Sequence, residues 1–289
     1  MPTKTAIMDP ELDPPPERRR LPLFAEVLGY LGAVIALSAG AVVVRQVWPK
    51  IPPAGSLCVA GIAALGLLAA GEVLCRRASE PAFGRLRSFL WLLATVAVGG
   101  FFAVLTSEVL KLSGGTAALI AEAGWTACAL VLWLRARSAL LHLAMFAGAL
   151  ALLCTGLSQI DPRVTLAGIG FAIWALSVAW ALAAYQGYLV PVTAGLTAGS
   201  LGGVIGSALI FSAAGEVLAL VTVAALLAAG VLTRRVVLLG FGAAGALWTI
   251  PDTVDRYLPG SIAAPLAVAL VGLLLLGVAL WVARTRRRA

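Results

Sequence analysis

Long runs of apolar residues, separated by short charged or proline-rich breaks, follow one another along nearly the whole chain. A helix needs about 20 mostly apolar residues to cross a hydrocarbon core of ~30 Å, and most of these runs are close to that length. Because lipid offers the backbone no water to bond, each run is expected to be an α-helix. The breaks delimit ten predicted spans: 23–44, 54–75, 88–107, 116–134, 139–157, 164–185, 189–211, 217–232, 236–250 and 261–283.

The composition agrees with a membrane protein. Of 289 residues, 61% are hydrophobic and 12% charged, whereas a soluble domain has roughly half its residues apolar and about a quarter charged. These values exclude an ordinary soluble enzyme, a disordered chain and a disulfide scaffold. The predicted fold class is all-α, a polytopic transmembrane helical bundle. Its predicted parts are a proline-rich, charged cytoplasmic tail (1–22), the transmembrane domain (23–283) and a basic cytoplasmic tail (284–289).

The basic residues indicate how the bundle is inserted. With the N-terminus inside, 16 of the 21 Lys and Arg residues fall on the cytoplasmic side and 5 outside, which predicts that both termini are cytoplasmic. Nine spans would place the basic C-terminus outside, so ten are preferred, although the eighth and ninth are short. We interpret the net charge of +8 as a topology signal, not as nucleic-acid binding. The Arg-rich, Ala/Gly/Leu/Val-rich composition suggests a bacterial inner membrane. The expected partners are the lipid bilayer and, as candidates, other membrane proteins or a second copy.

Glu122 is the least expected charge within a predicted span. It lies six residues into the fourth span, about 9 Å below its outer end at ~1.5 Å per residue, and no basic residue lies at that depth in any span. An ionised carboxylate there is costly, so Glu122 either carries a proton or faces a water-filled cavity. Thr126 shares its helical face, and Ser200 reaches a similar depth. A neutral carboxyl hydrogen-bonded within the bundle is the open alternative.

Glycines follow one face of the seventh span. Small residues let helix backbones approach closely in lipid, where hydrophobic burial does not drive association. The pattern predicts a helix-packing or self-association face, with a substrate path or a flexible transporter helix as alternatives. We expect Glu122 to line a polar cavity against this face. Its members are Gly195, Gly199, Gly202, Gly203 and Gly206.

Other motif-like residues do not form a recognisable catalytic or ligand site. A G-x-G-x-x-G match at 240–245 lies inside an apolar span, not between a strand and a helix, so dinucleotide binding is not indicated. Ser200 and His142 lie about 16 Å and 4.5 Å from the cytoplasmic ends of their spans, too far apart for the ~3 Å contact of a nucleophile and its base. His142 is expected at the membrane interface. We predict no enzymatic activity, no metal and no cofactor.

Residues near the span ends predict local contacts. Glu72 is expected to pair with Arg76 at i, i+4, and Glu108 with Lys111 at i, i+3. Six of the eight tryptophans lie near span ends and are predicted to be interfacial anchors; they are Trp48, Trp91, Trp133, Trp180, Trp248 and Trp281.

The first half of the chain resembles a known family. The stretches EVLGYLGAVIALSAGAVV and RQVWPKIP, then VAVGGFFAVLTSEVLKLSGG and LRARSALLHLAMFAGALALL, are similar to a family of prokaryotic membrane proteins defined as a domain of unknown function. The similarity covers about residues 23–157. It implies a multi-pass fold and brings no substrate, cofactor or catalytic residue. Ten helices with both ends inside are also typical of drug/metabolite transporters, but only the number of helices supports that analogy, because the two halves show no clear sequence similarity.

Two functions follow from these observations as hypotheses. The first is a structural or interaction protein that contacts other membrane proteins through the glycine face. The second is a small-solute transporter with Glu122 as its proton-coupling site.

Overall fold

The computed structural model describes residues 46–76, 81–161 and 163–257, with isolated positions between 262 and 277. The chain divides into two units, Met1–Pro52 and Pro53–Ala289. The described part of the first unit contains a short 3-10 helix, η1 (Trp48–Lys50). The predicted first span, both predicted tails and most of the tenth span lie outside the described residues.

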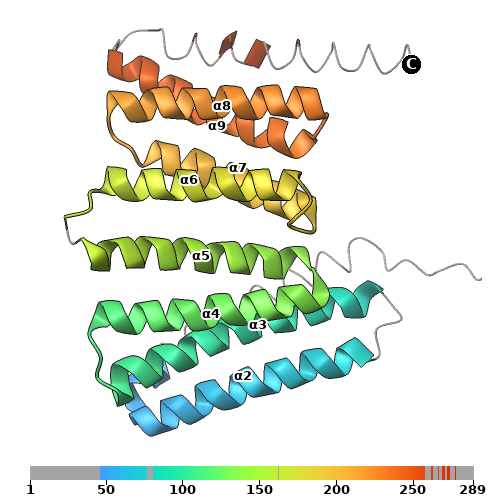
Figure 1. Ribbon diagram of the computed structural model, residues 1–289, viewed down its shortest axis with the longest axis vertical. Helices are drawn as coiled ribbons and strands as arrows, with labels where there is room; N and C mark the ends of the chain where they lie inside the picture. Colours follow the sequence, from blue (N-terminus) through green and yellow to red (C-terminus); the bar gives the residue numbers. More distant parts are fainter. Residues whose placement is uncertain are drawn as a thin grey trace, which may run out of the picture. The chain divides into compact units, whose positions relative to one another are not determined.

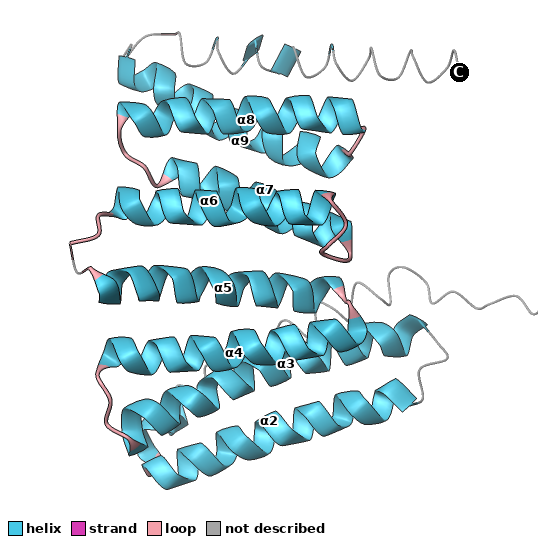
Figure 2. Ribbon diagram, in the orientation of Figure 1, coloured by secondary structure: helices cyan, strands magenta, loops and turns pink. Residues whose placement is uncertain are grey.

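Helices form all the regular structure of the described residues (Figure 2). The second unit contains α2 (Pro53–Arg76), α3 (Pro81–Val104), α4 (Gly114–Ala136), α5 (Ala139–Ile160), α6 (Leu166–Tyr185), α7 (Val192–Ala208), α8 (Ala213–Thr233) and α9 (Val236–Tyr257) (Figure 1). A π-helix, η2 (Leu105–Val109), continues α3. Seven of these helices are long and apolar enough to cross a membrane, and α7, with 17 residues, is shorter. The all-helical prediction is therefore confirmed for the described residues.

Each predicted span from the second to the ninth coincides with one helix. The eighth and ninth, predicted to be short, are complete helices of 21 and 22 residues. Helix α9 continues beyond Ile250, where its span was predicted to end, and Pro251 lies inside it. A proline removes one backbone hydrogen bond, and membrane helices tolerate this loss where neighbours satisfy the freed group. Helix α7 is shorter than the predicted 189–211, because Pro191 precedes its first turn and Ser212 already caps α8.

Polar residues set several helix ends. The hydroxyls of Ser138, Thr165 and Ser212 accept hydrogen bonds from backbone N–H groups in the first turns of α5, α6 and α8. Such caps satisfy donors that have no partner within the helix. Helices α4 and α8 end differently: the residue after each, Arg137 and Arg234, has left-handed backbone angles. These features allow very short turns between consecutive helices.

Consecutive helices of the second unit alternate in direction and lie side by side (Figure 1). Helix α3 packs against α2, α4 and α5, and α4 against α5. The same contact pattern recurs in the following four helices, where α7 packs against α6, α8 and α9, and α8 packs against α9. Helix α5 also contacts α6 and α7, so it joins the two groups of four helices. The two halves therefore share a contact pattern that their sequences do not reveal.

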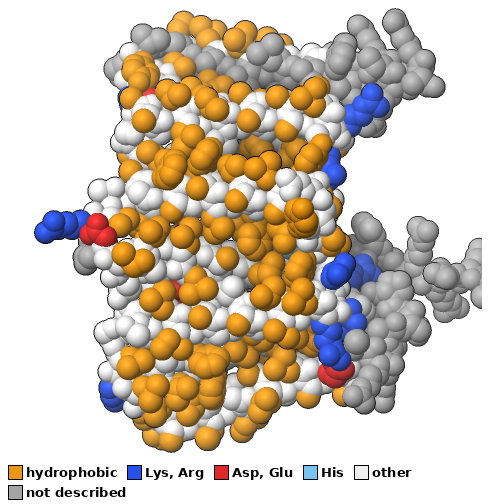
Figure 3. Space-filling view, viewed as in Figure 1, with side chains coloured by type: hydrophobic (Ala, Val, Ile, Leu, Met, Phe, Trp, Pro, Cys, Tyr) orange, Lys and Arg blue, Asp and Glu red, His pale blue; other side chains and the backbone are white. Residues whose placement is uncertain are grey.

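Charged side chains collect at the helix ends. We call the surface at which α2, α4, α6 and α8 end the basic face. Figure 3 shows Lys and Arg at the two edges where the helices end, with hydrophobic side chains between them. Ile62 and Leu65 of α2, for example, are 72% and 69% exposed. So much exposed apolar surface fits helices that face lipid, as in a multi-pass membrane protein. The basic residues of this face whose side chains the structure describes are Arg85, Arg87, Arg135, Arg137, Arg234 and Arg235.

Candidate functional site

Glu122 lies in the middle part of α4, eight residues after the helix begins and thus roughly 12 Å along its axis. Its Oε1 accepts a hydrogen bond of 2.9 Å from the hydroxyl of Thr155 on α5. Its Oε2 is buried and has no hydrogen-bond partner among the described residues. The other described acidic residues lie at or near helix ends. Glu122 is therefore a carboxylate within the span, and only one of its two oxygens has a hydrogen-bond partner among the described residues.

Thr126 does share a region with Glu122, but its hydroxyl does not bond the carboxylate. It donates to the backbone carbonyl of Glu122, one helical turn earlier, over 2.7 Å. A Cβ added to Gly148 of α5 would collide with the same hydroxyl. Gly148 therefore allows α4 and α5 to approach closely one helical turn from Glu122. This close packing brings the Thr155 hydroxyl within hydrogen-bond distance of the Glu122 carboxylate.

The site can hold a proton with little rearrangement. A protonated carboxyl keeps one oxygen as an acceptor, so Oε1 can still receive the Thr155 bond while Oε2 carries the proton. Within the described ranges, no three His, Cys, Asp or Glu residues lie together as a metal site would require. The sequence revealed Glu122 but not Thr155, because nothing in the pattern pairs residues 33 positions apart.

The glycine face of α7 is covered by other helices of the same chain. A Cβ added to Gly199 would lie 2.6 Å from the Ser177 carbonyl oxygen and 2.7 Å from the Ala181 Cβ, both on α6. Gly195, Gly202 and Gly206 likewise contact α6, and Gly203 lies nearest to α8. The prediction of close helix packing is therefore confirmed. Gly195 and Gly202 also lie close to His142 and Phe146 of α5. The Glu122 carboxylate instead bonds Thr155, and no contact between Glu122 and the glycine face is found among the described residues.

Ser200 is buried, with 2% exposure, and its hydroxyl has no hydrogen-bond partner within the described residues. It does not bond His142, whose Nε2 is occupied by an indole N–H. Among the described residues, no hydrogen bond therefore joins Ser200 to His142.

His142, the one histidine of the chain, lies in the first turn of α5, at the end of the helix nearest the basic face, and is fully buried among the helices. Its Nε2 accepts a hydrogen bond of 2.8 Å from the Trp180 indole on α6. Because Nε2 accepts, the proton of the neutral ring is on Nδ1. Trp133 of α4 and Trp180 both meet the imidazole edge-to-face, with centroids 5.7 and 5.8 Å away. His142 is thus enclosed by aromatic rings where α5 joins the two groups of four helices.

Two predicted interfacial anchors are instead core residues. Trp91 is 1% and Trp133 7% exposed, and the Trp133 indole donates to the Val190 carbonyl over 2.7 Å. Trp248, at 72% exposure, has the surface position expected of an anchor. Position near a span end therefore does not separate a lipid-facing indole from one turned toward a neighbouring helix.

The ion pairs lie at the helix ends. Glu108 and Lys111 pair as predicted, at 3.7 Å. Glu72 pairs with Arg135 of α4 at 2.6 Å, a partner that the sequence did not predict. The side chain of Arg76, the predicted partner, lies outside the part of the chain that the structure describes.

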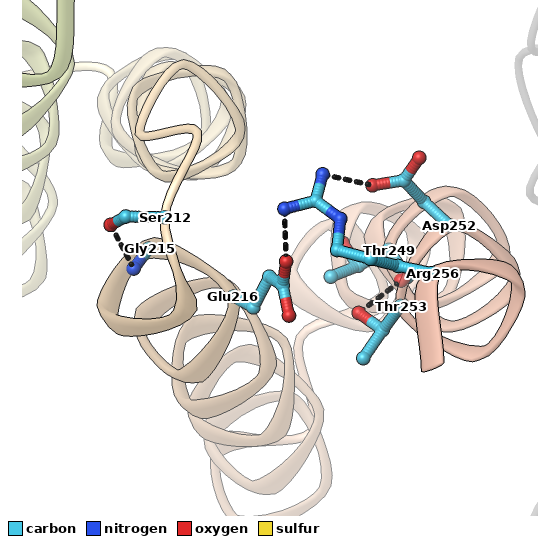
Figure 4. A network of polar contacts seen from close by, with 7 residues as sticks. All are labelled: Ser212, Gly215, Glu216, Thr249, Asp252, Thr253 and Arg256. Carbon is cyan, nitrogen blue, oxygen red and sulfur yellow. Dashed lines mark hydrogen bonds and ion pairs between the residues drawn. The ribbon is translucent and has the colours of Figure 1, made fainter. Parts of the chain in front are cut away.

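A third ion-pair group, not predicted, joins α8 to α9. In Figure 4, Arg256 of α9 lies between Glu216 of α8 and Asp252. Glu216 is nearly buried, and Arg256 is about half exposed. This group lies on the face opposite the basic face, and it anchors the polar end of α9 beyond Pro251.

Comparisons with family models, curated proteins and solved structures each found no match. The resemblance of the first half to a family of prokaryotic membrane proteins therefore stays a prediction.

Proposed function

We propose that the chain crosses a bacterial cytoplasmic membrane ten times, with both termini in the cytoplasm. The seven long apolar helices support repeated crossing. The arginines of the basic face, opposed by Glu72 among the described acidic side chains there, support a cytoplasmic location for that face.

Reporter fusions test this topology. A fluorescent protein that folds in the cytoplasm and a phosphatase active only outside it are each fused to either terminus. Fluorescence without phosphatase activity is expected at both ends, and signals from opposite sides would contradict the proposal.

We further propose that the protein moves a small solute across the membrane and that Glu122 binds the coupled proton. The observation that carries this proposal is the buried, unpartnered Oε2 of Glu122 beside an Oε1 that accepts from Thr155. Ionisable groups at this depth commonly belong to ion or substrate paths. Protonation at Oε2 would remove the charge while leaving the Thr155 bond intact. The proposed role is non-enzymatic.

The proton site can be tested without knowing the solute. Infrared difference spectra between neutral and acidic pH, recorded on protein in liposomes, detect the C=O stretch of a protonated carboxyl. We expect a band that Glu122→Gln removes and that Glu108→Gln retains, because Glu108 is exposed at a helix end. A band unchanged in Glu122→Gln would overturn the assignment.

Transport is tested in the same vesicles. A panel of amino acids, sugars and nucleosides is added outside while a dye reports internal pH. Wild-type protein should couple at least one solute to proton movement, and Glu122→Gln should abolish the coupling while Glu108→Gln retains it. Equal solute-driven proton flux in wild type and Glu122→Gln would reject Glu122 as the coupling site.

A structural or interaction role is the second candidate, and one observation favours it. Buried polar side chains bond between helices: Trp180 with His142, Trp174 with Thr222, and Thr155 with Glu122. Such bonds suit a fixed scaffold. A partner would need a surface other than the glycine face, which α6 covers. No solute-driven flux in wild type, together with a membrane protein that co-purifies specifically, would favour this role over transport.

A further inference from the structure

Two arginines on the basic face have backbone angles that normally favour glycine. Arg137, after α4, has φ 47°, and Arg234, after α8, has φ 55°. A side chain in this left-handed region is strained, because its Cβ crowds the backbone. Among the described residues, the third non-glycine residue there is Lys111, so all three are cationic. Cationic residues therefore occupy positions at which glycine would be less strained.

The two turns are built alike. Each joins antiparallel helices with two residues, 137–138 between α4 and α5 and 234–235 between α8 and α9. The backbone N–H of Arg137 donates to the Trp133 carbonyl, and that of Arg234 to the Gly230 and Val231 carbonyls. The backbone alone makes these bonds, so glycine would serve at either left-handed position. The neighbouring turn on the same face does use a glycine, Gly187, at φ 86°.

The charges of these two arginines are not neutralised within the described part of the chain. Both side chains are exposed, and the described acidic residue of the basic face, Glu72, is engaged by Arg135. Lys111 differs, because Glu108 pairs with it on the opposite face. Among the described residues, the guanidinium groups of the strained arginines therefore have no acidic partner, whereas the strained lysine does.

Aromatic side chains accompany the second turn. The Arg235 guanidinium lies over the Tyr185 ring, 5.9 Å from its centroid. Tyr185 and, in the loop after it, Tyr188 are 55% and 75% exposed. Exposed tyrosines next to cations at the ends of apolar helices are typical of the headgroup level of a membrane.

We propose that the Arg137 and Arg234 turns bind the phosphate groups of anionic phospholipids. A guanidinium offers two parallel N–H donors to phosphate oxygens, and near a membrane surface each basic residue adds attraction to anionic lipid. The positive-inside rule requires arginine somewhere in these loops; it does not require arginine at the strained position. Phosphate binding explains why the strained position keeps its side chain. The inference uses the membrane placement proposed above but not the role of Glu122.

The test compares thermal unfolding in nanodiscs of phosphatidylcholine alone and of phosphatidylcholine with phosphatidylglycerol. Phosphatidylglycerol should raise the Tm of the wild type. The double variant Arg137→Gly/Arg234→Gly should keep or raise the Tm in phosphatidylcholine and lose most of the phosphatidylglycerol shift. The double variant Arg137→Lys/Arg234→Lys, which keeps both charges, should retain part of the shift.

Lys111→Gly is the matched control, since it removes the same backbone strain from a paired cation on the opposite face. It should keep the full phosphatidylglycerol shift. Inorganic phosphate added to phosphatidylcholine nanodiscs should not reproduce the shift, which identifies the lipid as the source of the phosphate.

Three results would overturn the inference. One is a full phosphatidylglycerol shift in the double glycine variant. Another is a lower Tm of that variant in phosphatidylcholine alone, which would mean that the arginines stabilise their own helix ends. The third is an equal shift with inorganic phosphate. None of these results bears on proton binding by Glu122, which the infrared experiment tests separately.

Discussion

The indole N–H of Trp180 donates to Nε2 of His142, 2.8 Å away, and this bond joins α6 to α5. The imidazole is fully buried and is also flanked by Trp133. Helix α5 is the element that contacts both groups of four helices. The bond therefore lies at the junction on which the packing of the two groups depends.

Removal of that donor should destabilise the protein. Trp180→Phe keeps an aromatic ring but leaves the buried Nε2 without a partner, a loss of about 1–3 kcal/mol. Thermal unfolding in detergent measures it, with Trp248→Phe as the control, because Trp248 is 72% exposed and its change should stay within about 0.5 kcal/mol. Equal effects of the two variants would contradict the assigned role of the His142 contact.

The Thr155–Glu122 bond predicts a specific coupling between α4 and α5. Thr155→Val preserves the shape but removes the donor, so it should lower the free energy of unfolding by about 1–3 kcal/mol, whereas Thr155→Ser keeps the hydroxyl and should cost less. A cycle with Glu122→Met, which removes the acceptor oxygens, should give a non-additive term, as expected for residues in contact. Additive effects of the two substitutions would argue against the bond.

The fold could be predicted further than the site. The length and apolar character of the segments predicted the helices from the second to the ninth span, because a backbone exposed to lipid must form its hydrogen bonds within its own segment. What could not be predicted is which side chains meet across helices. Glu72, for example, pairs with Arg135, 63 residues later.

The glycine face shows the same limit of local patterns. Its spacing correctly indicated close helix approach, since that depends only on the absence of side chains along one face. The spacing of the glycines does not show which helix approaches them, and so the sequence alone predicted Glu122 opposite the glycine face. In the structure, α6 packs against most of these glycines, and the Glu122 carboxylate accepts a hydrogen bond from the Thr155 hydroxyl.

Glycine-to-alanine substitutions should distinguish glycines that contact a neighbouring helix from glycines that do not. Gly199→Ala places a methyl group within 2.6 Å of the Ser177 carbonyl oxygen, and overpacking of this kind costs about 1–3 kcal/mol. Gly100→Ala on α3 is the control, because a Cβ there meets no heavy atom within 4 Å. Its Tm should be unchanged or slightly raised, since alanine favours helix. A Gly199→Ala variant as stable as wild type would exclude the close approach of α6.

The Arg256–Glu216 pair should matter more than the exposed pair of Lys111 and Glu108. Arg256→Ala leaves the nearly buried Glu216 carboxylate without its cation, which should lower the free energy of unfolding by about 1–3 kcal/mol. Lys111→Ala, at a pair in which both side chains are more than half exposed, should change it by about 0–1 kcal/mol. Thermal unfolding at low and high salt checks both values.

Because the end of α9 beyond Pro251 is held to α8 by the Arg256–Glu216 pair, Arg256→Ala should also speed amide exchange in residues 252–257. Unchanged exchange there would show that the helix beyond Pro251 does not depend on the ion pair.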